Sequence, residues 1–116
     1  MKSFSFPKGE RLLNRKDFVN LNRSGKRYRT EHFTALCKEN GLDHTRLGIT
    51  VSKRIGNAVK RNRIKRLVRE FFRQNKESFL NGFDVNFIAD KNAHLLVFND
   101  VKKEMGSFIF VKKNNI

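Results

Sequence analysis

The chain of 116 residues is poor in several residue types, and each shortage excludes a class of protein. It has one cysteine, Cys37, so it forms no internal disulfide and suits a reducing compartment, where this thiol is expected to be a small buried group on a strand. No apolar run approaches the ~20 residues of a membrane-spanning helix, and the first residues lack the apolar core of a secretion signal. We therefore expect a cytoplasmic protein with no membrane partner.

Acidic residues are also scarce, with 11 Asp and Glu against 26 Lys and Arg, which gives a net charge of +15 at pH 7. So large a surplus repels itself in a compact chain and is typical of proteins that bind a polyanion, most often nucleic acid. Tryptophan is absent and tyrosine occurs once, so the 12 phenylalanines must supply much of the core. The length suits a single domain, 1–116, with residues 1–13 as an irregular arm because Pro7 and Gly9 disfavour regular structure.

Groups that could cleave RNA without help are not apparent in the sequence. A protein-only nuclease needs acidic or histidine side chains gathered around a metal ion or a phosphate. His32, His44 and His94 lack the spacing of metal ligands, and the acidic residues are scattered along the chain. The best available acidic pair is Asp84 and Asp90, on one predicted strand. The sequence therefore predicts neither catalytic residues nor a metal-binding site in the protein.

The region richest in positive charge is residues 53–73, where nine of 21 residues are Lys or Arg and only Glu70 is acidic. Four apolar residues recur there at i, i+3, i+4 and i+7, which predicts a helix over about 57–75: Ile64, Leu67, Val68 and Phe71. The arc opposite this apolar stripe carries Asn62, Lys65, Arg66, Arg69 and Arg73. A helix packed by its apolar side would therefore present a row of hydrogen-bond donors to a chain of phosphates.

The start of this basic helix is unusual for its charge. Gly56 and Asn57 suit the start and the N-cap, and acidic residues are normally favoured in the first turns of a helix. This helix instead has Lys60, Arg61 and Arg63 there. Backbone N–H groups at a helix start together with nearby cations form an anion site, for which phosphate is the usual ligand.

Alternating apolar residues predict three strands, over 31–38, 46–52 and 83–89. Asn40 and Gly41 suit a turn between the first two strands, which predicts a hairpin. The basic helix lies between the second and third strands, and the order strand, helix, strand predicts a parallel pair.

A short helix is predicted over 15–24, ahead of the strands. Asn14 followed by Asp17 resembles an N-terminal capping box, and Phe18 and Leu21 would face inward. A last helix is predicted from Asn99, on the spacing of Val101, Met105, Phe108 and Ile109. Gly106 would then lie in its interior, at a cost of about 1 kcal/mol relative to alanine.

Residues 47–70 resemble the signature of the protein subunit of bacterial ribonuclease P, and Arg61, Asn62 and Arg63 match the Arg-Asn-Arg motif of that family. The order helix, two strands, helix, strand, helix also matches, so the resemblance covers nearly the whole chain. It implies an α+β fold, a single-domain α-β-β-α-β-α sandwich with a left-handed βαβ crossover, like domain 2 of ribosomal protein S5. Physical reasoning alone would favour a right-handed crossover.

The resemblance also implies a division of labour between protein and RNA. The catalytic centre would be RNA, with Mg²⁺ bound mainly by that RNA, and the protein alone would be inactive. The partners would be the catalytic RNA and precursor tRNA, and not DNA. Nine residues match positions that face the catalytic RNA: Lys53, Arg54, Lys60, Arg61, Asn62, Arg63, Lys65, Arg66 and Arg69.

A cleft between the first helix and the sheet would take the single-stranded 5′ leader of precursor tRNA, and by the resemblance Phe18 and Leu36 belong to it. Family members often have a second aromatic residue where this chain has Asn22, and an aromatic residue where it has Leu36. A base stacked on an aromatic ring is worth about 1–3 kcal/mol, so these two departures predict weaker contacts with the leader.

Two other functions share some of these features. A ribosomal or chaperone-type RNA-binding protein would have the same charge and the same sheet-plus-helix layout, without a nuclease role and without a leader cleft. A DNA-binding regulator would place the basic helix in a major groove. The regulator is the weaker alternative, because rows of Arg and Lys contact the backbone, which positions a protein without specifying a sequence.

Overall fold

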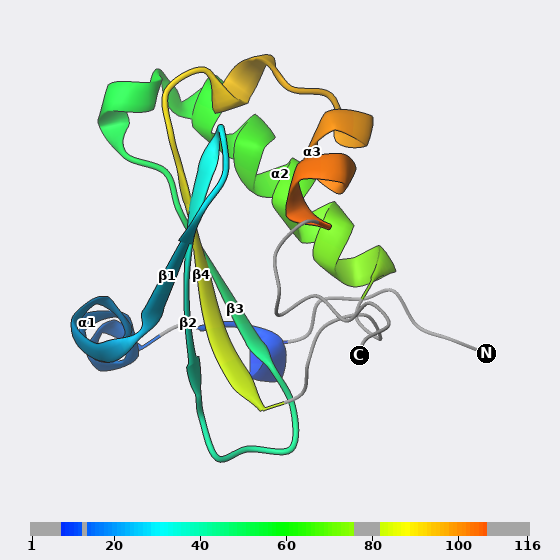
Figure 1. Ribbon diagram of the computed structural model, residues 1–116. Coiled ribbons are helices and arrows are strands. Elements are labelled where there is room, and N and C mark those ends of the chain that lie inside the picture. Colours follow the sequence, from blue (N-terminus) through cyan, green and yellow to red (C-terminus); the bar gives the residue numbers. More distant parts are fainter. Residues whose placement is uncertain (1–7, 13, 76–81, 107–116) are drawn as a thin grey trace.

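The computed structural model describes residues 8–12, 14–75 and 82–106, which form a four-stranded sheet with helices on both faces (Figure 1). The helices are α1 (Arg15–Ser24), α2 (Ala58–Gln74) and α3 (Phe98–Met105). The strands are β1 (Lys26–Arg29), β2 (Phe33–Glu39), β3 (Arg46–Thr50) and β4 (Phe83–Ala89). Three short 3-10 turns are η1 (Lys8–Glu10), η2 (Lys53–Ile55) and η4 (Ala93–Leu95). The α+β class is as predicted.

The strand order is β1-β2-β4-β3, which confirms one predicted pairing and corrects another. Strands β3 and β4 are parallel neighbours joined through α2, as predicted, with Leu47 opposite Val85. The predicted hairpin between β2 and β3 is wrong, because β4 lies between them and pairs with β2 in antiparallel fashion. The hairpin partner of β2 is β1, a strand that the sequence analysis missed. Three of the four residues of β1 are exposed cations, so it shows no apolar alternation.

The two faces of the sheet carry two separate apolar clusters. The larger cluster joins one face of the sheet to α2 and α3, and its most buried residues include Phe33, Phe87, Ile64, Val68 and Val101. The smaller cluster joins the opposite face to α1 and consists of Leu12, Leu21 and Leu36. Cys37 belongs to the larger cluster, and burial raises the pKa of its thiol, which confirms the prediction of a small buried group on a strand.

The helix ends follow local sequence signals closely. The Asn14 side chain accepts a hydrogen bond from the Lys16 backbone, and the Asn57 side chain accepts one from the Lys60 backbone, so both predicted N-caps of α1 and α2 are confirmed. The last helix is shorter than predicted. It ends at Met105, and Gly106 is its C-cap instead of an interior residue. Phe108 and Ile109 lie outside the described residues.

Part of the predicted N-terminal arm is ordered against the sheet. Residues 8–10 form a 3-10 turn, Arg11 makes a parallel bridge to Leu47, and the Leu12 backbone N–H donates to the Leu47 carbonyl at 2.8 Å. This segment therefore covers part of the outer edge of β3. No helix among the described residues has the length and apolar character to cross a membrane.

Candidate nucleic-acid interface

The predicted apolar stripe of α2 is the side that packs against the sheet. Ile64, Val68 and Phe71 are buried, together with Phe72, and Leu67 is partly buried. The opposite side exposes Asn62, Arg66 and Arg69, and Lys53, Arg54 and Lys60 are exposed at or before the helix start. Helical geometry thus separates the apolar residues from the polar row, as the spacing predicted.

Most of these cations have no acidic partner. Among the described residues, no carboxylate pairs with Lys53, Arg54, Lys60, Arg61, Lys65, Arg66 or Arg69. The one acidic residue of α2, Glu70, is already bound by Arg73 and by Gln74. We call the seven unpaired cations the α2 cation surface. No acidic side chain in the described part of the chain neutralises this surface, which favours an anionic ligand.

The start of α2 combines a backbone conformation that favours glycine with a first helical turn that lacks acidic residues. Gly56 has a φ of 154°, which side chains rarely adopt, and a Cβ there would lie 2.7 Å from the Lys60 side chain. The first turn of the helix carries no acidic residue. Backbone N–H groups, the helix dipole and Lys60 therefore act in the same direction on a phosphate.

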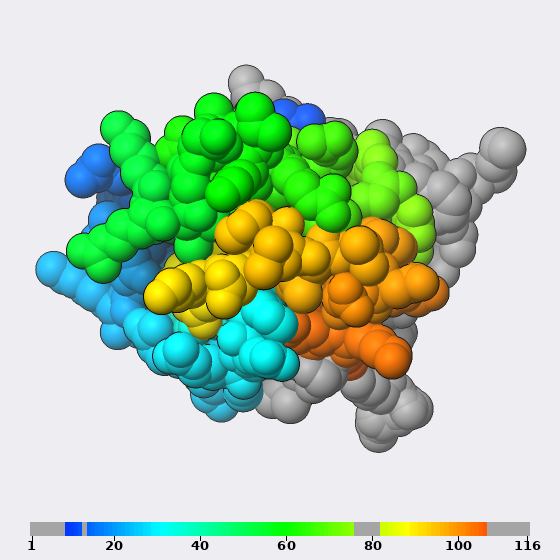
Figure 2. Space-filling model, turned by 90° about the horizontal axis from the view of Figure 1, so that it is seen from above, coloured from blue at the N-terminus to red at the C-terminus, as the bar shows by residue number. Residues whose placement is uncertain are grey.

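Arg63 is placed differently from Arg61, the other cation of the Arg-Asn-Arg motif. Its Nε donates to the His94 carbonyl at 3.3 Å and its Nη2 donates to the Leu96 carbonyl at 2.7 Å. Figure 2 shows the segment around these residues (gold) lying along α2 (green). Arg63 was predicted to face the catalytic RNA, and the structure uses at least two of its donors to hold this segment against the helix.

A groove runs between α1 and the sheet. It has a volume of about 480 Å³ and is lined on the helix side by Arg15, Phe18, Val19 and Asn22 and on the sheet side by Thr50, Asn86 and Ile88. A smaller pocket of about 190 Å³ lies beside it, lined by Arg11, Leu12, Phe18, Leu47, Gly48, Ile49, Lys65 and Arg69. Phe18 lines both hollows. The groove and the α2 cation surface therefore meet around the edge strand β3.

Phe18 owes its position to a glycine in β3. A Cβ at Gly48 would lie 2.7 Å from Cε1 of the Phe18 ring, so the ring occupies the space that a side chain at position 48 would need. Phe18 is half-buried there. Leu36 needs a correction. It is 1% exposed and packs with Leu12 and Leu21 beneath α1, so its side chain does not line the groove. Asn22 does line it.

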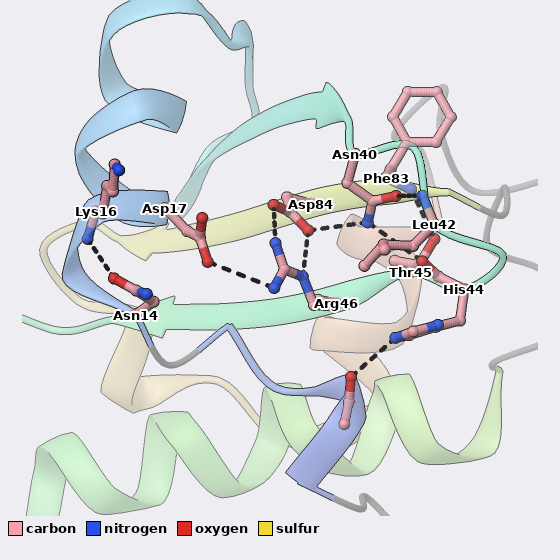
Figure 3. Close-up of polar contacts among 11 residues, drawn as sticks. Asn14, Lys16, Asp17, Asn40, Leu42, His44, Thr45, Arg46, Phe83 and Asp84 are labelled. Carbon is pink, nitrogen blue, oxygen red and sulfur yellow. Dashed lines mark hydrogen bonds and ion pairs between the residues drawn. The ribbon is translucent and has the colours of Figure 1, made fainter.

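A polar network lies between α1 and the sheet, and the sequence analysis missed it (Figure 3). Arg46 makes two hydrogen bonds to the Asp84 carboxylate, at 2.8 and 2.7 Å, and its Nη1 lies 3.4 Å from Oδ2 of Asp17. These bonds to Asp84, more than the charge of Asp17, raise the pKa of the Arg46 guanidinium. Asn40 also donates to Asp84, at 2.9 Å. Apolar alternation predicted both strands that carry Arg46 and Asp84. It did not reveal that the strands pair with these two residues opposite each other, so the contact could not be recognised from the sequence.

Metal ligands are not gathered anywhere in the described residues, where no group of three His, Cys, Asp or Glu side chains could hold a metal ion. Asp84 and Asp90, the best acidic pair in the sequence, lie near opposite ends of β4. Each faces an arginine, Arg46 for Asp84 and Arg29 for Asp90. They do not form a joint site.

Comparison with known proteins agrees with this geometry. A sequence model of the family described as Ribonuclease P matches residues 6–113. The chain belongs to the ribonuclease P protein family. It is 47% identical over 116 residues to the ribonuclease P protein component of Syntrophus aciditrophicus, covering all of this chain and 98% of that one.

Solved structures of ribonuclease P proteins have the same fold. The protein from Thermotoga maritima matches with a TM-score of 0.77 and 39% identity, over 83% of this chain and 91% of that one. The protein from Staphylococcus aureus matches with a TM-score of 0.77 and 33% identity, over 84% of this chain and 90% of that one. As a member of this family, the chain is a subunit of an endoribonuclease holoenzyme that acts in tRNA processing, and it has an RNA partner there.

Proposed function

We propose that the chain binds the catalytic RNA of ribonuclease P through the α2 cation surface and the 5′ leader of precursor tRNA through the groove beside Phe18. The observation that carries this proposal is the junction of the two features, because Lys65 and Arg69 of α2 line the pocket next to the groove and Phe18 lines both hollows. A leader in the groove and the catalytic RNA on the α2 cation surface would therefore lie next to each other on the protein.

The chemistry of cleavage is assigned to the RNA. In this proposal Mg²⁺ is bound mainly by the RNA subunit, and the protein supplies position and charge. Cations of α2 neutralise phosphates of the catalytic RNA, and the groove holds the leader. The holoenzyme would then bind its substrate more tightly and need less Mg²⁺. We place this activity in the cytoplasm, which suits a single free cysteine.

Cleavage of precursor tRNA at low Mg²⁺ tests the proposal. The reaction is run with purified protein alone, with the cognate catalytic RNA alone, and with both together. We expect cleavage with both and none with protein alone. Cleavage by protein alone would contradict the assignment of catalysis to the RNA. If the protein does not stimulate the catalytic RNA, a ribosomal or chaperone-type role with another RNA would be favoured instead.

Phe18 provides a second test, directed at the groove. Replacement of Phe18 by Ala removes the aromatic ring on which a leader base would stack. We expect the affinity for a precursor with a long leader to fall about 5- to 150-fold, in line with 1–3 kcal/mol for one stacked base. Binding of mature tRNA, which has no leader, should change little. Equal losses for both substrates would contradict the role of Phe18.

A further inference from the structure

Arg46 is held rigidly from the sheet side. It stands on the edge strand β3, and its Nε and Nη2 donate to the two oxygens of Asp84 on the neighbouring strand, at 2.8 and 2.7 Å. Asn40 donates to the same carboxylate at 2.9 Å. A bidentate pair of this kind fixes the plane of the guanidinium as well as its position. The remaining nitrogen, Nη1, is therefore aimed in one direction.

That direction is toward α1. Nη1 of Arg46 lies 3.4 Å from Oδ2 of Asp17, and both side chains are mostly buried, at 23% and 27% exposure (Figure 3). The other contacts between α1 and this face of the sheet are chiefly apolar, through Leu21 and Leu36, and apolar contacts have little directional preference. A second polar link, from Lys38 to the Ser24 hydroxyl, lies at the far end of the helix.

The Asp17–Arg46 ion pair and the contact of Phe18 with Gly48 lie next to each other on both α1 and β3. Asp17 and Phe18 are neighbours on α1, while Arg46 and Gly48 are two positions apart on β3 and so point to the same face of the sheet. Asp17 meets Arg46, and the Phe18 ring meets the bare backbone of Gly48. Two successive residues of the helix are thus matched to two successive positions on one face of the strand. A rotation of α1 would break both contacts together.

We propose that Arg46, locked by Asp84, is a positioning residue for the leader groove. Through Asp17 it sets the rotation of α1 and so places the Phe18 ring over Gly48, where the ring forms the wall between the two hollows. The ligand served is single-stranded RNA, and this inference rests on the proposed function of the groove. Asp17 and Arg46 need not touch the RNA themselves.

Replacement of Asp17 by Ala tests the proposal, because the change in net charge and the loss of the positioning contact should have opposite effects on RNA binding. Loss of an acid raises the net charge by one, which by itself should strengthen RNA binding. Loss of the positioning contact should instead raise KM of the holoenzyme for a precursor with a long leader, by roughly two- to five-fold, the size expected for one partly exposed ion pair. KM for a precursor with a one-nucleotide leader and affinity for the catalytic RNA should stay unchanged.

Glu39→Ala is the matched control. It removes one negative charge from an exposed residue at the end of β2, next to Asn40. The Glu39 side chain makes no hydrogen bond or ion pair with Asp17, Arg46 or Asp84. We expect its KM for the long leader to be unchanged or lower. If Asp17→Ala behaves like Glu39→Ala, or raises KM equally for both leader lengths, the proposal is overturned.

A measurement without RNA separates this proposal from the proposed function. The Phe18 ring should displace the proton resonances of Gly48 by its ring current, and Asp17→Ala should move them toward ordinary glycine values while Glu39→Ala leaves them in place. Unchanged Gly48 resonances in Asp17→Ala would overturn the positioning role whatever the kinetics show. If instead the wild-type holoenzyme shows no preference for the long leader, the proposed function of the groove fails, and the Gly48 resonances still decide the positioning.

Discussion

Arg46 and the arginines of α2 carry the same charge in opposite surroundings. Arg46 is mostly buried and bound to Asp84 and Asp17. Arg66 and Arg69 are exposed, and no carboxylate among the described residues pairs with them. The comparison teaches that net charge does not distinguish cations that hold a fold together from cations kept available for a partner. The partners of each side chain do distinguish them.

The largest effect on stability is expected from breaking the ion pairs of Arg46. Arg46→Ala leaves the Asp84 carboxylate, itself 13% exposed, without its bidentate partner. Removing one member of such a pair costs about 3–5 kcal/mol of unfolding free energy, because a charge remains buried and uncompensated. Arg66→Ala, the matched arginine on the exposed surface, should change stability by less than about 0.5 kcal/mol. Urea denaturation measures both, and similar losses would refute the distinction.

The exposed region should respond through RNA binding instead. If roughly 4 to 6 phosphates are neutralised, the logarithm of the affinity for the catalytic RNA should fall with the logarithm of the salt concentration at a slope of about −3 to −5. The double variant Arg66→Ala, Arg69→Ala should make this slope shallower by about 1.5 to 2. Lys26→Ala, an exposed cation on β1 at the opposite edge of the sheet, should leave it unchanged. A wild-type slope near zero would disprove the electrostatic account.

Arg63 sharpens the comparison because it was predicted to face the catalytic RNA, yet it has hydrogen-bond partners within the chain. Arg63→Ala removes two hydrogen bonds to backbone carbonyls. We expect the free energy of unfolding to fall by about 1–3 kcal/mol, since the carbonyls of His94 and Leu96 lose a charged donor. Asn62→Ala, at an exposed neighbouring position, is the control and should not change it. Unaltered stability in Arg63→Ala, with a loss of RNA affinity, would instead assign Arg63 to the RNA-binding residues.

The sequence predicted best what depends on neighbours along the chain. The lengths of α1 and α2, their asparagine caps and the polar row on α2 follow from local periodicity and capping. Contacts between residues far apart in the sequence could not be predicted from such local patterns. Arg46 finds Asp84 38 residues away, and Arg63 finds its carbonyls 31 and 33 residues away.

The errors in the sheet have a related cause. The hairpin between β2 and β3 was predicted from proximity along the chain, whereas β4 inserts between them and buries both of its edges. Apolar alternation reveals that a strand exists without revealing its neighbour. Strand β1 escaped notice because only Tyr28 among its residues is half-buried. The burial of Leu36 depends on where α1 crosses the sheet, which no local pattern specifies.

The smallest effect is expected at His44, at the edge of the polar network around Arg46. One ring nitrogen lies 2.9 Å from the Asp43 carboxylate and the other 3.0 Å from the Gly9 carbonyl. The hydrogen bond with Asp43 is the main cause of a raised pKa at His44 and a lowered pKa at Asp43. Because the folded pKa of His44 is raised, its contribution is complete below the unfolded value, about 6.5, and is lost as pH rises through the folded value.

The test compares the wild type with His44→Gln by thermal unfolding at about pH 5.5 and pH 8.5. The wild type should be more stable than the variant by a larger margin at the lower pH. The margin should shrink again in strong acid, as Asp43 becomes protonated below its lowered pKa. Since the Asp43 side chain is 99% exposed and the His44 side chain 42% exposed, added salt should reduce the difference. A margin that is larger at pH 8.5 would contradict the assignment.

The cationic strand β1 also has a consequence for the free protein. An edge strand presents unpaired backbone N–H and C=O groups, onto which another chain can add. The outer edge of β1 carries exposed Lys26, Arg27 and Arg29, and the opposite edge of the sheet is partly covered by the backbone of Arg11 and Leu12. A second copy of this chain would bring the same charges to the same edge. Repulsion between these charges therefore disfavours edge-to-edge pairing of two copies of the sheet while no RNA is bound.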